Sequence, residues 1–362
     1  MDRFNERLQF PSRLATKIYR QIAAIDAVKG QWRLVNTLSP QMVQRLQSSV
    51  LVTSTGASTR IEGSKLSDKQ VQALFHKHRI TKFRTRDEQE VGGYLEVLQT
   101  VFEHWNSIPF SESSILHLHQ QMLQHSQKDA RHKGTYKFGS NRVEARDETG
   151  QLVGIIFDPT PPHLVSKEMQ ELVAWTKQEL EDDNFPTLLI IANFIFEFLA
   201  IHPFQDGNGR MSRILTNLLL LQSGYAFCPF VSHEKIIEDN KADYYIALNQ
   251  TQQTWKSNNE DVSSWVLFFL KVLETQSQQA LRLMTDEPTE LFLSDLQNQV
   301  WEYANSVDTF SRKEVVEATG VNIRTVDYTL RKLIEMNKIE RFGQGRATRY
   351  RIKITDHYPS YF

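Results

Sequence analysis

Cysteine is almost absent from the 362-residue sequence, since Cys228 is the single one and no internal disulfide can form. This usage fits a protein of a reducing compartment. A long hydrophobic run is also missing. The most apolar stretch, residues 187–201, is too short to span a bilayer comfortably and contains Asn193 and Glu197. We therefore expect no membrane-spanning helix.

An excess of charge of either sign is missing too. The formal net charge of −1 gives no general reason to expect nucleic acid or a membrane as partner. The first residues, MDRFNERLQFPSRL, are polar and lack the apolar core of a secretory signal. With 40% hydrophobic and 23% charged residues, the sequence predicts a soluble, globular, cytoplasmic protein with room for two or three domains.

Helical periodicity covers most of the chain. Apolar residues recur at spacings of three and four, which favours a mainly α fold built as a helical bundle. The predicted helices are 12–28, 40–55, 68–78, 87–106, 111–124, 163–180, 187–201, 210–222 and 260–284. Because 187–201 is apolar nearly all round, we expect it at the centre of the bundle.

One segment, 141–162, breaks the helical pattern. Two short β-type runs flank DETG at 147–150, and the second run stops at a cluster of prolines that begins with Pro159. This arrangement predicts a β-hairpin. An isolated hairpin is marginal in water, so it is either docked on the bundle or used to hold a ligand.

The C-terminal part predicts a separate small domain. Residues 311–353 give a helix, a turn at Gly320, a second helix and two strands around Gly343 and Gly345, which is the order of a winged helix. Eleven Lys and Arg against five Asp and Glu make this part locally basic. We divide the chain into an N-terminal helical region (1–85), a core (86–275), a linker (276–290) and a winged-helix domain (291–362).

The stretch HPFQDGNGRMSR, residues 202–213, carries the clearest chemistry. A glycine-rich loop that leads into a helix presents free backbone N–H groups to an anion. Arg210 and Arg213 are three residues apart, so both can lie on one helix face. Two guanidinium groups favour a polyphosphate, and Asp206 is the nearby oxygen ligand for a divalent metal. An EF-hand is excluded, because its glycine position holds Met211 and its glutamate position Asn217.

His202 precedes this loop at the end of the apolar helix. An imidazole with an ordinary pKa of ~6.5 is mostly neutral at cytosolic pH and can accept a proton. His202 is therefore a candidate general base. The alternative is a core histidine that is satisfied by a backbone carbonyl.

The stretch 202–213 matches every specified position of His-x-Phe-x-(Asp/Glu)-Gly-Asn-Gly-Arg-x-x-Arg, and by it the chain resembles the Fic family of AMP transferases. The resemblance implies transfer of AMP from ATP to a target hydroxyl, with release of pyrophosphate and His202 as the base. Asp206 would hold Mg²⁺, and Phe204 would anchor the loop in the core. The implied phosphate-binding set is Gly207, Asn208, Gly209, Arg210, Met211, Ser212 and Arg213.

The resemblance also gives the hairpin a role as a flap that aligns the target's main chain by strand addition. The matching stretch is GIIF, which is Gly154, Ile155, Ile156 and Phe157. An ordinary edge hairpin is the alternative. Tyr244 and Tyr245 resemble the paired tyrosines that close over the nucleotide in this family, although adjacent tyrosines on a helix also serve in packing.

A further stretch, STRIEG, resembles the inhibitory motif of the same family. Ser58 and Glu62 would share one helix face, and Gly63 would end the helix. The resemblance implies that Glu62 pairs with Arg213 and so blocks the productive pose of ATP. In some members the same glutamate aligns water for removal of AMP. The alternative is a solvated Ser/Glu pair.

Three other histidines, His117, His119 and His125, are predicted to be structural or exposed, because neither cysteine nor further acid completes a metal site.

The expected partners are ATP, a protein with a Ser, Thr or Tyr hydroxyl, and the chain itself as a substrate. Relatives suggest a homodimer. Two alternatives are a regulator whose winged helix binds DNA or docks protein, with the core as nucleotide sensor, and transfer of another phosphate-containing group.

Overall fold

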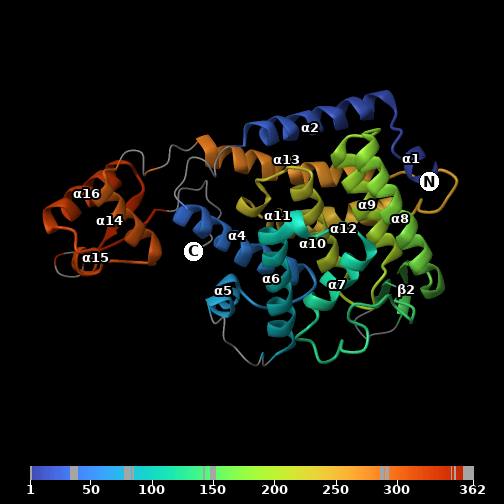
Figure 1. Ribbon diagram of the computed structural model, residues 1–362, viewed down its shortest axis with the longest axis horizontal. Coiled ribbons are helices and arrows are strands. Elements are labelled where there is room, and N and C mark those ends of the chain that lie inside the picture. Colours follow the sequence, from blue (N-terminus) through green and yellow to red (C-terminus); the bar gives the residue numbers. More distant parts are fainter. Residues whose placement is uncertain are drawn as a thin grey trace. The chain divides into compact units, whose positions relative to one another are not determined.

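The structure is a computed structural model. It describes residues 2–32, 40–76, 83, 85–141, 143–146, 152–285, 289, 293–343, 345 and 348–353. Among these residues the fold is mainly helical, as predicted (Figure 1). The described residues up to Leu281 form one compact unit and those from Arg282 onward form a second. The N-terminal helices thus share a unit with the core, and the finer domain boundaries stay predictions.

The helices of the first unit are α1 (Asp2–Glu6), α2 (Ser12–Gln31), α4 (Pro40–Ile61), α5 (Asp68–His76), α6 (Arg86–His104), α7 (Glu112–Met122), α8 (Pro162–Asp182), α9 (Thr187–Ile201), α10 (Asn208–Gln222), α11 (His233–Asp239), α12 (Lys241–Gln252) and α13 (Ser263–Thr285). Nine of these described helices agree with the sequence prediction to within a few residues at most ends, and α1, α11 and α12 were not predicted. Short 3₁₀ turns occur at Trp105–Ser107 and Cys228–Phe230. Within the described chain no helix is long and apolar enough to cross a membrane.

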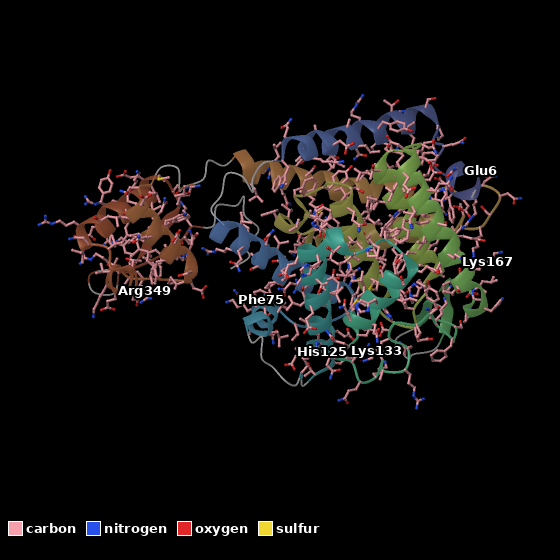
Figure 2. All side chains as sticks on the ribbon, viewed as in Figure 1. Glu6, Phe75, His125, Lys133, Lys167 and Arg349 are labelled. Atoms are coloured by element: carbon pink, nitrogen blue, oxygen red, sulfur yellow. The ribbon has the colours of Figure 1, made fainter. Side chains whose placement is uncertain are left out.

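Helix α9 forms the centre of this unit, as its sequence predicts. Every residue from Leu188 to Ile201 is buried, and α8 and α10 pack directly against it. Figure 2 shows side chains filling the space between these ribbons. Helix α2 lies along α13, where Gln21 donates to Glu274 (Figure 1). Burial of so much aliphatic and aromatic surface is the main stabilising contribution to such a bundle.

The predicted hairpin is present. Strand β1 (Val143–Arg146) pairs antiparallel with β2 (Leu152–Phe157), with Glu144 opposite Ile155 and Ala145 opposite Gly154. The predicted DETG turn lies outside the described residues, as do the side chains at 154–156. Phe157 is the buried end of the hairpin, at 8% exposure.

The second unit contains α14 (Asp295–Ser306), α15 (Arg312–Thr319), α16 (Ile323–Glu335), β3 (Ile339–Phe342) and β4 (Arg349–Ile352). Gly320 ends α15 with a φ of +69°, and β3 pairs antiparallel with β4. Its core is built around Val300, Phe310, Val326 and Leu333. Helix, turn, helix and β-ribbon follow one another in the order that the sequence predicts for a winged helix.

Candidate active site

The end of α9 fixes the ring of His202. His202 is the C-cap of the helix and adopts φ 52° and ψ 60°, a left-handed conformation that is uncommon for a residue with a Cβ. Its Nδ1 lies 3.2 Å from the carbonyl oxygen of Leu199. A carbonyl only accepts, so Nδ1 bears the proton and Nε2 keeps a free lone pair. Burial lowers the pKa of His202 to about 4, which keeps the ring neutral at pH 7.

The loop that follows is held by a side-chain amide and by a second histidine. Asn208 donates to the carbonyl of Phe204 and accepts from its N–H, both at 2.8 Å. The ring of Phe204 is fully buried and stacks on His119, with centroids 3.6 Å apart. The N–H of Gly134 donates to Nδ1 of His119, so Nε2–H donates to the carbonyl of Asp206 at 3.0 Å. Burial lowers the pKa of His119 to about 4.

Two residues that the sequence analysis missed, Lys137 and Asn141, secure the start of the same loop. Asn141 donates to the carbonyls of His202 and Phe204, at 3.2 and 2.8 Å. Lys137 donates to Asn141 and to the carbonyl of Ile201, at 2.7 and 3.1 Å, and burial lowers its pKa to about 8. A cation at the C-terminal end of α9 is favoured by the helix dipole. No periodicity or motif around 137–141 signals this role.

The N-terminus of α10 follows this loop and has the features of an anion-binding helix end. Gly207 adopts a φ of +86°, and a side chain there would collide with Met122. The amides of 208–210 precede the first intrahelical bond and are free to bind an anion. The amide of Met211 already donates to Gly207, and the Ser212 hydroxyl donates to Gly209. Met211 and Ser212 therefore have no free donor for a phosphate in this structure, and their role as phosphate ligands stays a prediction.

The structure brings Ser58, Glu62 and Arg213 together. Arg213 is 2% exposed, and it donates to the Ser58 hydroxyl at 2.8 Å and to Glu62 at 2.7 Å. The carboxylate of Glu62 occupies the space beside Gly209, where a Cβ would collide with it. Gly63, with φ +103°, ends the turn after α4. Burial would lower the pKa of Arg213, but the nearby Glu62 and two tyrosines raise it above its usual value, so the guanidinium stays charged.

Arg210 and Asp206 belong to a second charged cluster. Arg210, at 2% exposure, lies 3.1 Å from Asp206 and 3.2 Å from Glu90. Arg86 bridges the same two acids, 2.6 Å from Glu90 and 3.2 Å from Asp206. Although burial would raise the pKa of Asp206, Arg210, the Gly207 amide and Arg86 hold it below its usual value. Arg86 and Glu90 were not identified from the sequence, in which they read as helix surface.

Asp206 is a chemically suitable site for Mg²⁺, although the described residues contain no group of three or more metal-binding side chains. The Asp206 side chain is 32% exposed and ionised at the edge of the anion-binding helix end. Mg²⁺ commonly binds through one or two carboxylates together with substrate phosphates and water. The donor set therefore fits a metal that arrives with a nucleotide.

The paired tyrosines have different environments. Tyr244 is 4% exposed and packs its ring against Trp265 and Phe268, with centroids 5.9 and 5.8 Å away. Tyr245 is 45% exposed, and its hydroxyl lies 3.5 Å from the carbonyl of Ile61, beside Glu62. Tyr244 thus packs in the core and also interacts with Arg213, whereas Tyr245 offers an accessible ring at the turn that carries Glu62.

Comparison with known proteins gives the family of this chain. A sequence model of the Fic/DOC family matches residues 109–220. A Fido domain-containing protein of Dictyostelium discoideum is 34% identical over 109 residues, 30% of this chain and 71% of that protein. A probable protein adenylyltransferase of Aquifex aeolicus (strain VF5) is 28% identical over 189 residues, 52% of this chain. The chain spans only 54% of the length of that relative.

A solved structure agrees over nearly the whole chain. The crystal structure of a Fic family protein from Desulfovibrio desulfuricans G20 is 25% identical, covers 96% of this chain and 98% of its own, and has a TM-score of 0.64. The described chain shares that protein's fold, and its 202–213 loop lies within the matched family segment. The chain belongs to the Fic/DOC family.

Proposed function

We propose that this protein is an adenylyltransferase that moves AMP from ATP to a hydroxyl of a target protein. The observation that carries the proposal is the tautomer of His202. Because Nδ1–H is bound to Leu199, the proton-free Nε2 remains available next to the anion-binding end of α10. The name of the Aquifex relative supports the same activity.

The chemistry follows from these groups. His202 Nε2 takes the proton of a Ser, Thr or Tyr hydroxyl, in the target or in another copy of this chain. The hydroxyl oxygen then forms a bond to the α-phosphorus of ATP, while the bond from that phosphorus to the bridging oxygen breaks and pyrophosphate leaves. A general base so placed contributes roughly 10²–10⁴ in rate. The amides of 208–210 stabilise the charge that develops on the phosphate oxygens.

The charged side chains account for the rest of the triphosphate. Arg210 and Arg213 neutralise the outer phosphates, for which two buried guanidinium groups are suited. Asp206 would hold Mg²⁺, which would supply positive charge on the phosphates. The hairpin β1–β2 aligns the target's main chain by strand addition, and Tyr245 covers the nucleotide.

Glu62 acts as an internal brake in this proposal. Its carboxylate lies beside Gly209 and binds Arg213, so an anionic group of the chain itself occupies part of the anion site. A carboxylate at the C-terminal end of α4 is disfavoured by the helix dipole, and the contact with Arg213 compensates for this. The same carboxylate could orient a water for AMP removal.

The test is transfer of label from α-³²P-ATP with Mg²⁺ to the chain itself and to proteins of a lysate. Glu62→Gly should raise labelling about tenfold or more, since losing ~1.4 kcal/mol of competing interaction corresponds to tenfold. Glu62→Gln is the matched control, because it keeps the size but loses the charge, and it should give an intermediate rise. Labelling that is absent even in Glu62→Gly would contradict the transferase.

Nucleic-acid binding by the second unit is a second candidate. The exposed face of α16 carries Arg324, Tyr328 and Arg331, which is a suitable set for contacting phosphates and bases. Binding to duplex DNA that weakens steeply with salt and survives His202→Ala would support it. Docking of a protein on this unit is the other outcome.

The homodimer stays a prediction that a sedimentation measurement would test.

A further inference from the structure

The hairpin β1–β2 is attached to the helical unit at the point where its second strand ends. The ring of Phe157 lies 5.4 Å from that of Trp255, centroid to centroid. Three residues later, the buried Thr160 accepts from the ammonium of Lys256 at 3.3 Å. Lys256 also pairs with Glu168 of α8 at 2.5 Å. Two consecutive residues of the segment after α12 thus hold the chain where it leaves the hairpin.

Trp255 is in turn bound to the helix that carries His202. Its indole Nε1–H donates to both carboxylate oxygens of Glu197, at 3.2 and 3.1 Å. Glu197 belongs to α9, is fully buried and precedes His202 by five residues. One continuous set of contacts therefore runs from Phe157 through Trp255 and Glu197 to the helix that ends at His202.

Two arginines at the N-terminus maintain the charge of Glu197. Arg3 in α1 and Arg7 just after it both lie 2.6 Å from its carboxylate. Burial would raise the pKa of Glu197, but these arginines lower it below the usual value. An ionised acceptor makes the hydrogen bond from Trp255 charge-assisted, and such bonds are about twice as strong as neutral ones.

The backbone beside Trp255 is held in a strained conformation. Lys256 adopts a φ of +59°, in the left-handed region. Its N–H donates to Glu260 at 2.7 Å, and Glu260 pairs with Arg3 and Arg7 at 2.8 Å each. Figure 1 shows α1 next to the segment that follows α12, which is drawn in yellow-orange. Strain of this kind persists only where the surroundings enforce it, and it recurs at functional sites.

From this chain of contacts we infer that Trp255 is a positioning residue, which sets the hairpin at a fixed distance from His202 and thereby aligns the target's hydroxyl with the base. The inference rests on the proposed function, because the hairpin's role in holding the target belongs to it. Reacting atoms must approach to ~3–3.5 Å, and a misplacement of about 1 Å can cost up to ~10²-fold in rate. The set Glu197, Arg3, Arg7 and Glu260 acts through Trp255.

The experiment compares Trp255→Phe with Trp265→Phe in the full chain that also carries Glu62→Gly. Trp265 is the matched control, since its indole N–H also donates to α9, at the carbonyl of Ala192 (2.8 Å), with its contacts directed to Tyr244 and Phe268. Hydrogen exchange of the β2 amides is measured in both. Transfer is measured as a function of target and of ATP concentration.

For Trp255→Phe we expect exchange in β2 to quicken about tenfold and kcat/KM for the target to fall about tenfold, with KM for ATP within about twofold. Trp265→Phe should leave the exchange of β2 unchanged. Equal exchange of β2 in Trp255→Phe and the parent would overturn the inference, as would a loss confined to KM for ATP. A Glu62→Gly parent that transfers no AMP, while exchange of β2 quickens in Trp255→Phe and not in Trp265→Phe, would support the attachment of the hairpin through Trp255 and contradict the proposed function.

Discussion

Two histidines of this protein lie at the loop 202–213, His202 at its start and His119 against Phe204 and Asp206, and burial lowers the pKa of both to about 4. Their ring nitrogens are nevertheless used in opposite ways. His119 accepts from Gly134 with Nδ1 and donates to Asp206 with Nε2–H, so both nitrogens are satisfied. Among the described residues, His202 makes a hydrogen bond only through Nδ1, to the carbonyl of Leu199. A lowered pKa therefore identifies a neutral ring, and the second nitrogen decides whether that ring can take a proton.

The largest effect should come from His202→Ala. In a Glu62→Gly chain, where the brake is absent, we expect the transfer rate to fall about 10²–10⁴-fold, because the proton acceptor is lost. Binding of ATP, measured by calorimetry, should stay within about twofold, since the proposed function assigns the phosphates to α10 and the arginines. Retention of more than about a tenth of the rate would show that the free Nε2 is not the base. The functional difference drawn between His202 and His119 would then be wrong.

His119→Phe should act on stability. The substitution keeps a ring stacked on Phe204 but leaves the N–H of Gly134 and the carbonyl of Asp206 without partners. A stranded group costs about 1–3 kcal/mol when it is buried. Because both groups are only partly buried, we expect the lower part of the summed cost, a fall in the free energy of unfolding of about 2–4 kcal/mol in urea denaturation. His117→Phe, on the exposed side of the same helix, is the control. An unchanged stability in His119→Phe would mean that both groups find other partners.

The free energy of unfolding, measured as a function of pH, tests whether the buried ring of His119 stays neutral. Because the folded pKa of His119 is lowered from about 6.5 to about 4, the unfolded chain binds the extra proton first as the pH falls. The contribution to stability is complete above pH ~6.5 and is lost as the pH falls towards 4, to a total of ~3 kcal/mol. His119→Phe should therefore flatten the decline in unfolding free energy between pH 6.5 and 4. A decline of unchanged steepness would contradict the assignment.

The sequence predicts the helices, the hairpin and the loop 202–213, because each depends on local periodicity or on residue types that are close together in the chain. It also predicts the contact of Glu62 with Arg213, but only through a family resemblance. Lys137, Asn141 and Arg86 escaped prediction because their roles depend on tertiary contacts. Lys137 and Asn141 bind carbonyls some 60 residues away, and Arg86 reaches Asp206 across 120 residues. His119 was predicted as structural or exposed, and the structure shows the first of these, a buried ring bonded through both nitrogens.

The smallest effect should come from the surface histidine His125, which completes the comparison (Figure 2). Its Nε2 lies 3.0 Å from Glu96, and its side chain is 29% exposed. Exposed pairs of this kind contribute about 0–1 kcal/mol. His125→Ala should shift the unfolding free energy by about 0.5 kcal/mol or less and leave the transfer rate of the Glu62→Gly chain within about twofold. A larger loss of transfer would mean that distance from the loop does not separate structural histidines from the base, and that α7 and the segment after it act on His202 through contacts other than those of His119.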